Sequence, residues 1–139
     1  MKQRIALILI AVFAVVSVAS AQVKVNKREL QKATDEVTKL YRLSPEQQQQ
    51  VREIQEWRLR NMTEIEAIRS SDYPAYLDKR RSVRMGAEQS IKRLLNESQL
   101  VIFEQQMAER RQRELDLMRS MKRQGVTPEK IQLALLEIE

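Results

Sequence analysis

The chain has 139 residues, of which 32% are charged, and it carries a formal net charge of +6 with no Cys and no His. The absence of Cys and His excludes disulfides, a Cys or His nucleophile–base pair, and His- or Cys-based transition-metal sites. With two Gly residues and 4% aromatic residues, a β-sandwich, an α/β fold and a glycine-rich phosphate loop are disfavoured. We therefore expect an all-α protein that is not an enzyme and that holds no cofactor and no metal.

The first 21 residues have the three parts of a secretory signal peptide. Basic residues near the start precede an apolar run over residues 5–18, and small residues at 19–21 form a cleavage site. The run is shorter than the about 20 residues that a membrane-spanning helix needs, which weighs against a membrane anchor. We expect residues 1–21 to be cleaved, residues 22–139 to form one helical domain, and the protein to be located in a periplasm or outside the cell.

Beyond this segment, the chain predicts long helices joined by short breaks. Apolar residues recur at three- and four-residue spacings, as on one helical face, over about residues 26–41, 44–69, 74–95, 96–124 and 127–138. All three Pro residues stand at or near helix starts, and Gly125 follows the fourth helix as a typical C-terminal cap. Trp57 could be a core residue or a surface contact, and the core is expected.

Two of these helices begin with the same short pattern. LSPEQ begins at position 43 and LNESQ at position 95, so the two copies are 52 positions apart. In each, a cap residue accepts a bond from a backbone N–H, and Gln three residues later reaches back to the N–H of the cap. Taken alone, such a capping box indicates only that a helix starts. The motif residues are Leu43, Ser44, Gln47, Leu95, Asn96 and Gln99.

Arginines interrupt the apolar faces of the long helices. A compact bundle with a large core would not accept so many polar positions on its seam. We therefore expect an open or elongated arrangement with apolar surface left for a partner, although the arginines could also extend to solvent at the rim of an ordinary core. The interrupting arginines are Arg58, Arg80, Arg81, Arg84, Arg110 and Arg111.

The paired motifs, the signal peptide and the basic, Met- and Gln-rich helical composition resemble the Spy/CpxP family. Members are periplasmic helical stress proteins defined by two LTxxQ motifs. Here Ser44 and Asn96 replace the two Thr residues, and Asn is an equally good cap. The resemblance covers about residues 30–121 and implies a four-helix chain in a hairpin or cradle arrangement that forms an antiparallel homodimer. The last helix, from Thr127 onward, has no required counterpart.

The resemblance implies two alternative functions. Spy-type members are ATP-independent chaperones with a basic, partly apolar concave face, so the chain is expected to bind unfolded or misfolded envelope proteins in a stress response. CpxP-type members also restrain a membrane sensor kinase, so the alternative is a regulatory partner of the periplasmic domain of such a stress sensor. The basic charge also suggests nucleic-acid binding, but charge alone is a weak signal and export separates the protein from nucleic acid.

The expected client surface combines cationic and flexible apolar side chains. Arginines supply long-range attraction to acidic unfolded chains, and methionines adapt to varied apolar partners, although each could equally be ordinary core. Met62, Met85 and Met121 are further methionines of this flexible kind. The residues expected to bind clients are Arg58, Arg80, Arg81, Arg84, Met107, Arg110, Arg111 and Met118.

Overall fold

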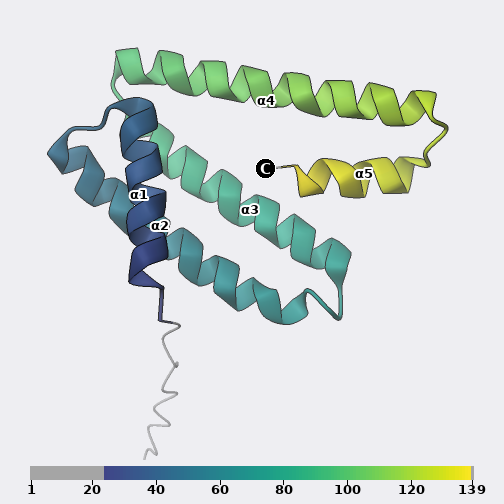
Figure 1. Ribbon diagram of the computed structural model, residues 1–139, viewed down its shortest axis with the longest axis horizontal. Helices are drawn as coiled ribbons and strands as arrows, with labels where there is room; N and C mark the ends of the chain where they lie inside the picture. Colours follow the sequence, from purple (N-terminus) through teal and green to yellow (C-terminus); the bar gives the residue numbers. More distant parts are fainter. Residues whose placement is uncertain (1–23, 139) are drawn as a thin grey trace, which may run out of the picture.

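The computed structural model describes residues 24–138, and this part of the chain contains five α-helices and no strand (Figure 1). The predicted all-α fold class is therefore confirmed for the described residues, whereas the expected signal peptide lies outside them. None of the described helices is both long and apolar enough to cross a membrane. The elements are α1 (Lys27–Tyr41), α2 (Pro45–Ile65), a 3-10 turn (Glu66–Ile68), α3 (Tyr73–Lys92), α4 (Glu97–Arg123) and α5 (Pro128–Glu137).

Local signals in the sequence set the helix ends. The side chains of Asn26, Ser44, Asp72 and Asn96 accept hydrogen bonds from backbone N–H groups in the first turns of α1 to α4. These caps satisfy donors that have no partner within a helix. Beyond the end of α4, Gly125 has a positive φ of 71°, the left-handed conformation that ends many helices and that Gly adopts without steric cost. The predicted breaks between helices are therefore present.

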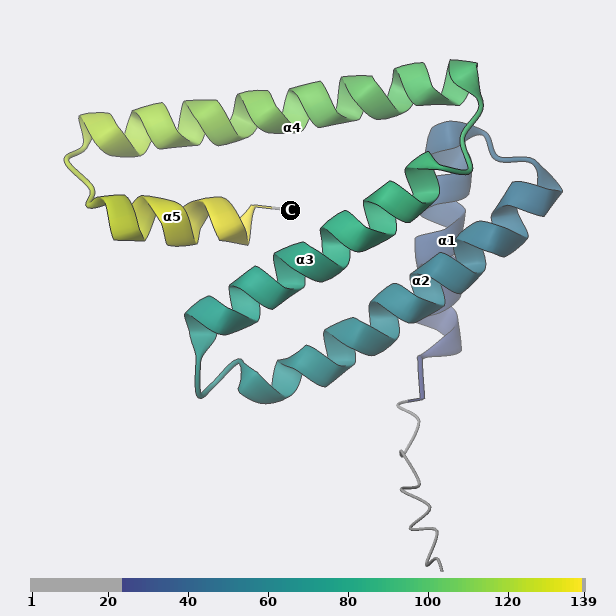
Figure 2. The ribbon, with the colours of Figure 1, turned by 180° about the vertical axis from the view of Figure 1, so that it is seen from behind.

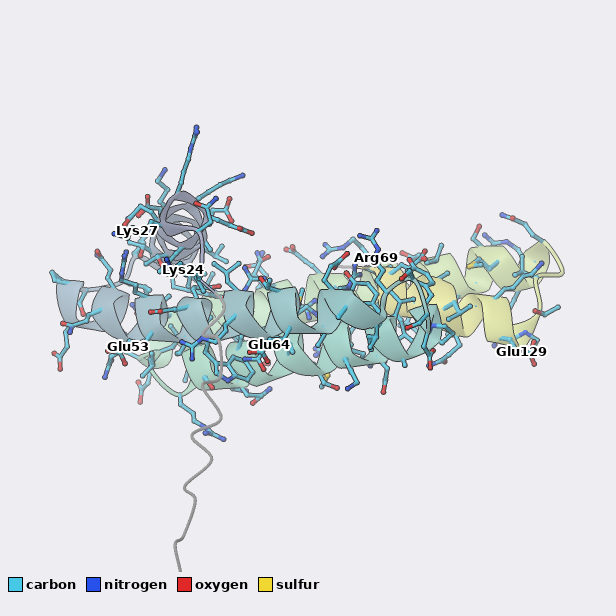
Figure 3. The ribbon with its side chains drawn as sticks, turned by 90° about the horizontal axis from the view of Figure 1, so that it is seen from below. Lys24, Lys27, Glu53, Glu64, Arg69 and Glu129 are labelled. Atoms are coloured by element: carbon cyan, nitrogen blue, oxygen red, sulfur yellow. The ribbon has the colours of Figure 1, made fainter. Side chains whose placement is uncertain are left out.

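The helices form a thin, elongated molecule. α2 and α3 run antiparallel side by side in both ribbon views (Figures 1 and 2), and α5 folds back along α4 towards α3. Seen from below, α2 to α5 lie in one flat layer, and α1 packs on one face of it (Figure 3). A single layer of helices has two faces, and α1 covers only part of one of them.

Buried apolar side chains form two separate clusters instead of one continuous core. The first cluster lies where the α1–α2 and α3–α4 connections meet, and it contains Tyr41, Leu43, Val51, Ile91, Leu95 and Phe103. The second lies where α5 meets α3, and it contains Tyr76, Leu77 and Leu136. Each cluster is small for a chain of this length, so much of the apolar surface of the helices stays outside a core.

Trp57 lies in neither cluster, so the prediction that it belongs to the core is wrong. It is 43% exposed on the surface of the α2–α3 pair. Its ring lies over Gly86 of α3, where an added Cβ would be 3.2 Å from Trp57 Cη2. The missing side chain at Gly86 lets the flat ring lie across the two helices from outside. Leu40 of α1 is also 43% exposed.

Candidate functional site

Both sequence motifs form complete capping boxes. In the first, Ser44 Oγ accepts a hydrogen bond from Gln47 N at 3.3 Å, and Ser44 N donates to Gln47 Oε1 at 3.0 Å. In the second, Asn96 Oδ1 accepts from Gln99 N, and Asn96 N donates to Gln99 Oε1, both at 3.0 Å. Each glutamine amide keeps an NH₂ group for a further partner after closing its own box.

That further partner is the other motif. Gln47 Nε2 donates to Gln99 Oε1 at 2.8 Å, and Gln99 Nε2 donates to Gln47 Oε1 at 3.0 Å. Each amide also reaches the backbone before the other motif: Gln47 Nε2 donates to Leu94 O at 2.8 Å, and Gln99 Nε2 donates to Arg42 O at 3.5 Å. Each hydrogen bond that one motif donates to the other therefore has an equivalent in which donor and acceptor come from the positions 52 residues away. We call this pair of boxes the glutamine joint.

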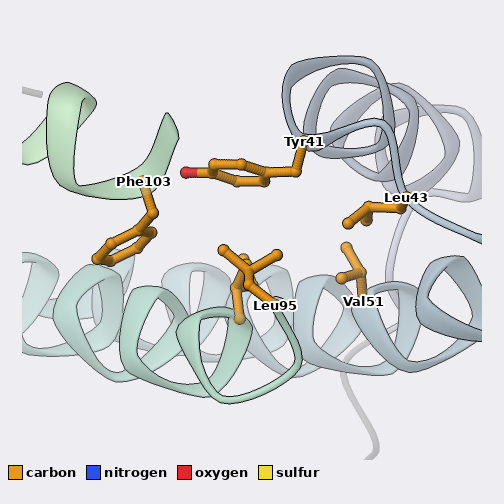
Figure 4. Packing of buried hydrophobic residues seen from close by; sticks show 6 residues of the cluster. Tyr41, Leu43, Val51, Leu95 and Phe103 are labelled. Carbon is orange, nitrogen blue, oxygen red and sulfur yellow. The ribbon is translucent and has the colours of Figure 1, made fainter. Parts of the chain in front are cut away.

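Buried apolar residues next to the glutamine joint repeat with the same spacing of 52 residues. Leu43 and Leu95 are both buried, and the residues eight positions after them, Val51 and Phe103, are buried in the same cluster (Figure 4). Tyr41 packs against Phe103 with ring centroids 6.3 Å apart. The two motifs therefore do more than start helices, because together they tie the α1–α2 connection to the α3–α4 connection.

Removing either cap should weaken the fold by about 1 kcal/mol. Ser44→Ala and Asn96→Ala each delete the side-chain acceptor of a backbone N–H and leave the rest of the box in place. Ser82→Ala is the matched control, because Ser82 is exposed within α3 and bonds only the carbonyl of Asp78 four residues earlier. Urea unfolding followed by circular dichroism measures all three. Equal midpoints for Ser44→Ala and Ser82→Ala would contradict the role of the cap.

Four of the six predicted arginines line one pocket. Arg58 comes from α2, and Arg80, Arg81 and Arg84 come from α3. The pocket has a volume of about 160 Å³, and its remaining lining is apolar, from Met62 and Leu136. No acidic side chain lines it among the described residues. We call this site the arginine pocket; it combines concentrated positive charge with apolar contact surface.

The end of α5 engages two of these arginines. Arg80 Nη2 donates to the carbonyl oxygens of Leu136 at 3.3 Å and Glu137 at 2.9 Å, and Arg84 Nη1 donates to Ile138 O at 2.6 Å. The last carbonyls of a helix have no partner within it and carry partial negative charge, so cations bind there favourably. Sequence analysis predicted α5 but not this contact, because backbone carbonyls leave no signature in the sequence.

A second group of predicted residues lies around a half-buried carboxylate, that of Glu88. Arg110 forms a bidentate ion pair with Glu88 across α3 and α4, with N–O distances of 3.0 and 2.7 Å. Arg84 Nε lies 3.9 Å from Glu88 Oε1 and has no hydrogen-bond partner among the described residues. Burial and the neighbouring Arg110 lower the pKa of Arg84. Glu88 therefore balances the charge of two arginines, a role that sequence analysis missed.

This carboxylate lies beside a second, open cavity of about 280 Å³ between α1, α2, α3 and α4. Met107 lines this cavity together with Arg84 and Arg110, so one predicted methionine does join the arginines. Arg111 and Met118 line neither this cavity nor the arginine pocket. Arg111 is exposed on α4, and Met118 is half-buried there. The structure thus brings together six of the eight predicted client-binding residues around two cavities that share Arg58 and Arg84.

Alkaline pH should destabilise the chain partly through Tyr41. Burial raises the pKa of Tyr41 above its usual value near 10.0, and Glu88 raises it further. A raised pKa in the folded state means that this contribution is complete below about pH 10 and is lost as the pH rises through the folded-state value. Tyr41→Phe should therefore lose less stability than the wild type between pH 9 and pH 11, in about the window of tyrosine ionisation. If the free energies of unfolding of the wild type and of Tyr41→Phe fall by the same amount across this pH range, Tyr41 makes no such contribution.

Comparison of the chain with models of protein families, with characterised proteins and with solved structures gave no significant match.

Proposed function

We propose that this chain is an exported, ATP-independent chaperone-like protein that binds unfolded or misfolded envelope proteins. The observation that carries the proposal is the arginine pocket, which arginines from α2 and α3 line together with the apolar side chains of Met62 and Leu136. The resemblance of the two motifs to those of the Spy/CpxP family supports the same function. Export, which rests on residues 1–21, would place the protein where no ATP is present.

The charge pattern of the pocket suits unfolded partners without a defined sequence. Long-range attraction between charges raises encounter rates with acidic segments, and apolar side chains at and near the pocket then hold an aliphatic or aromatic side chain of the client. Exposed apolar side chains elsewhere on the thin layer extend the contact surface. Besides Trp57, the large ones are Leu40, Tyr73, Met85, Val101 and Leu115. Unfolded chains offer both kinds of partner, whereas folded soluble proteins keep most apolar side chains buried.

We also propose that two copies pair as an antiparallel homodimer with a cradle-like shape. Two small clusters give each chain little core of its own, and small chains with limited burial commonly gain stability by association. The open face around Trp57 and Gly86, with Ile54 and Leu94 beside them, leaves a groove of about 660 Å³ that a second copy could cover.

Association can be followed by the fluorescence of Trp57, the single tryptophan. If the dimer covers the α2–α3 face, acrylamide should quench Trp57 less at tens of micromolar protein than under dilution, since the ring would leave solvent. Sedimentation velocity provides the control for mass. A compact monomer at tens of micromolar would contradict the dimer, and a dimer with unchanged quenching would place the interface elsewhere.

The direct test of chaperone function is light scattering from a denatured client diluted into buffer without nucleotide. An equimolar amount of the exported chain should suppress most of the scattering, and added ATP should change nothing. Lysozyme at the same concentration controls for net positive charge. A chain that protects no client would contradict the proposal and favour the regulatory alternative, which a pull-down of envelope membranes would then examine.

N-terminal sequencing of the exported protein should begin at Gln22.

A further inference from the structure

α5 is held on α3 by contacts of two kinds. Leu136 is buried with Tyr76 and Leu77, and Leu133 packs against the same cluster. The backbone carbonyls at the end of α5 accept bonds from Arg80 and Arg84. In addition, Tyr73 donates its hydroxyl hydrogen bond to Glu137 Oε1 at 2.8 Å. The contact between α5 and α3 therefore consists of buried apolar side chains followed by oxygen atoms that accept hydrogen bonds.

α5 does not satisfy every donor of the arginine pocket. Arg81 makes no hydrogen bond or ion pair to another described residue, and Arg84 Nε, 3.9 Å from Glu88 Oε1, has no hydrogen-bond partner among the described residues. The pocket also keeps a volume of about 160 Å³ with Leu136 at its edge. Carboxylate groups bind guanidinium donors more strongly than backbone carbonyls do. The carboxylate in the last turn of α5, Glu137, accepts from Tyr73, so a ligand whose carboxylates reached the arginines themselves would satisfy this site better than α5.

The position of α5 depends on this contact. A helix of ten residues is marginal on its own, because isolated helices need about 12–15 residues even in favourable sequences. Its connection to α4 passes through Gly125, whose φ of 71° is one of several conformations open to glycine. Elements that are held by few buried side chains open more readily than the rest of a fold. α5 thus depends on its contacts with α3 and α4 for its position.

We propose that α5 occupies the client-binding surface of α3, formed by Tyr73, Tyr76, Leu77, Arg80 and Arg84, and that clients bind there by displacing it. The fitting client is an apolar helical segment whose last turn carries carboxylates. The proposal rests on the proposed chaperone function and adds to it a defined surface, a ligand chemistry and a built-in competitor.

The experiment compares full-length chains in which α5 is locked or released. Tyr73→Cys with Glu137→Cys, joined by a short bismaleimide, locks α5, and the wild type has no other Cys that could react. Leu136→Asp releases α5 by placing a charge in the apolar cluster. Gln132→Asp, at an exposed position of the same helix, is the matched control for the added charge. Circular dichroism checks that each variant keeps its helices.

The first readout is direct binding of a fluorescent peptide with the sequence of residues 127–139. The released chain should bind the peptide at least tenfold more tightly than the locked chain, and the Gln132→Asp chain should bind like the wild type. Adding Arg80→Gln and Arg84→Gln to the released chain should reverse most of the gain. Equal binding by the released and locked chains would overturn the proposal. If Leu136→Asp does not fold, Tyr73→Phe with Glu137→Gln weakens the attachment of α5 by removing only the hydrogen bond between these two side chains.

The second readout is capture of a permanently unfolded, reduced and alkylated protein by the same variants. The released chain should capture it at least threefold faster than the wild type, and the locked chain should capture it slowest. Equal capture by locked and released chains overturns the α5 proposal while the chaperone function stands. If no variant captures the client although the released chain binds the peptide, the chaperone function fails and the α5 surface stands as a docking site.

Discussion

Replacing Gln99 with Ala should lower the free energy of unfolding by roughly 2–3 kcal/mol, because it strands several polar groups at once. Gln99 is 6% exposed. Its amide accepts from Asn96 N and from Gln47 Nε2 and donates to Gln47 Oε1. Without Gln99, the backbone N–H of Asn96 loses its acceptor, and Gln47 Nε2 and Oε1 each lose one hydrogen bond. Denaturant unfolding of the purified chain measures the change.

A double-mutant cycle tests whether the two motifs act as one joint. Gln47→Ala alone should cost a similar amount, and the double variant should cost at least about 1 kcal/mol less than the sum, since either change removes the same bonds. Gln49→Ala is the matched control at an exposed position of α2, where surface substitutions usually stay within about 0.5 kcal/mol. Strictly additive losses would mean that each box only starts its own helix.

Replacing Arg58 and Arg81 with Glu should slow client capture about tenfold at low salt, because it reverses the charge of the arginine pocket that steers acidic segments. These two positions are preferable to Arg80 and Arg84, which also hold the end of α5. Within residues 24–138, Arg58 donates only to Gln55 of its own helix, through Nε at 2.7 Å. Stopped-flow mixing with a labelled unfolded protein gives the rate.

The control for this change keeps the same net charge. Arg28→Glu with Arg113→Glu alters two exposed positions that do not line the arginine pocket, so its capture rate should stay within twofold of the wild type. The deficit of the pocket variant should shrink as salt rises, since screening acts over about 8 Å at physiological ionic strength. Two double variants with the same capture rate at low salt would show that net charge, not the pocket, attracts clients.

The helices and their starts were predictable because their signals are local. Ser44, Asn96 and Gly125 act through the residues next to them, so spacing alone indicates their roles. The repeat of the two motifs was also visible. That Gln47 and Gln99 bond each other was not, because a capping box has the same sequence whether its glutamine faces water or another helix.

The other features that sequence analysis missed depend on distant residues. Trp57 was expected in the core by its size, but Gly86 on the neighbouring helix leaves room for the ring at the surface. Glu88 lies four residues after Arg84, which is a visible pairing, yet its main partner, Arg110, comes from the next helix. The arginine pocket was predicted as a set of residues. That Arg80 and Arg84 hold α5 whereas Arg58 and Arg81 do not could be seen only from the fold.

The most direct test of the central claim is the fluorescence anisotropy of a labelled, permanently unfolded protein titrated with the exported chain in the absence of nucleotide. We expect saturable binding at micromolar concentration that weakens as salt is raised, and that weakens at low salt when Arg58 and Arg81 are replaced by Glu. An anisotropy that does not change at any salt concentration, or binding that is indifferent to both salt and these two arginines, would contradict it.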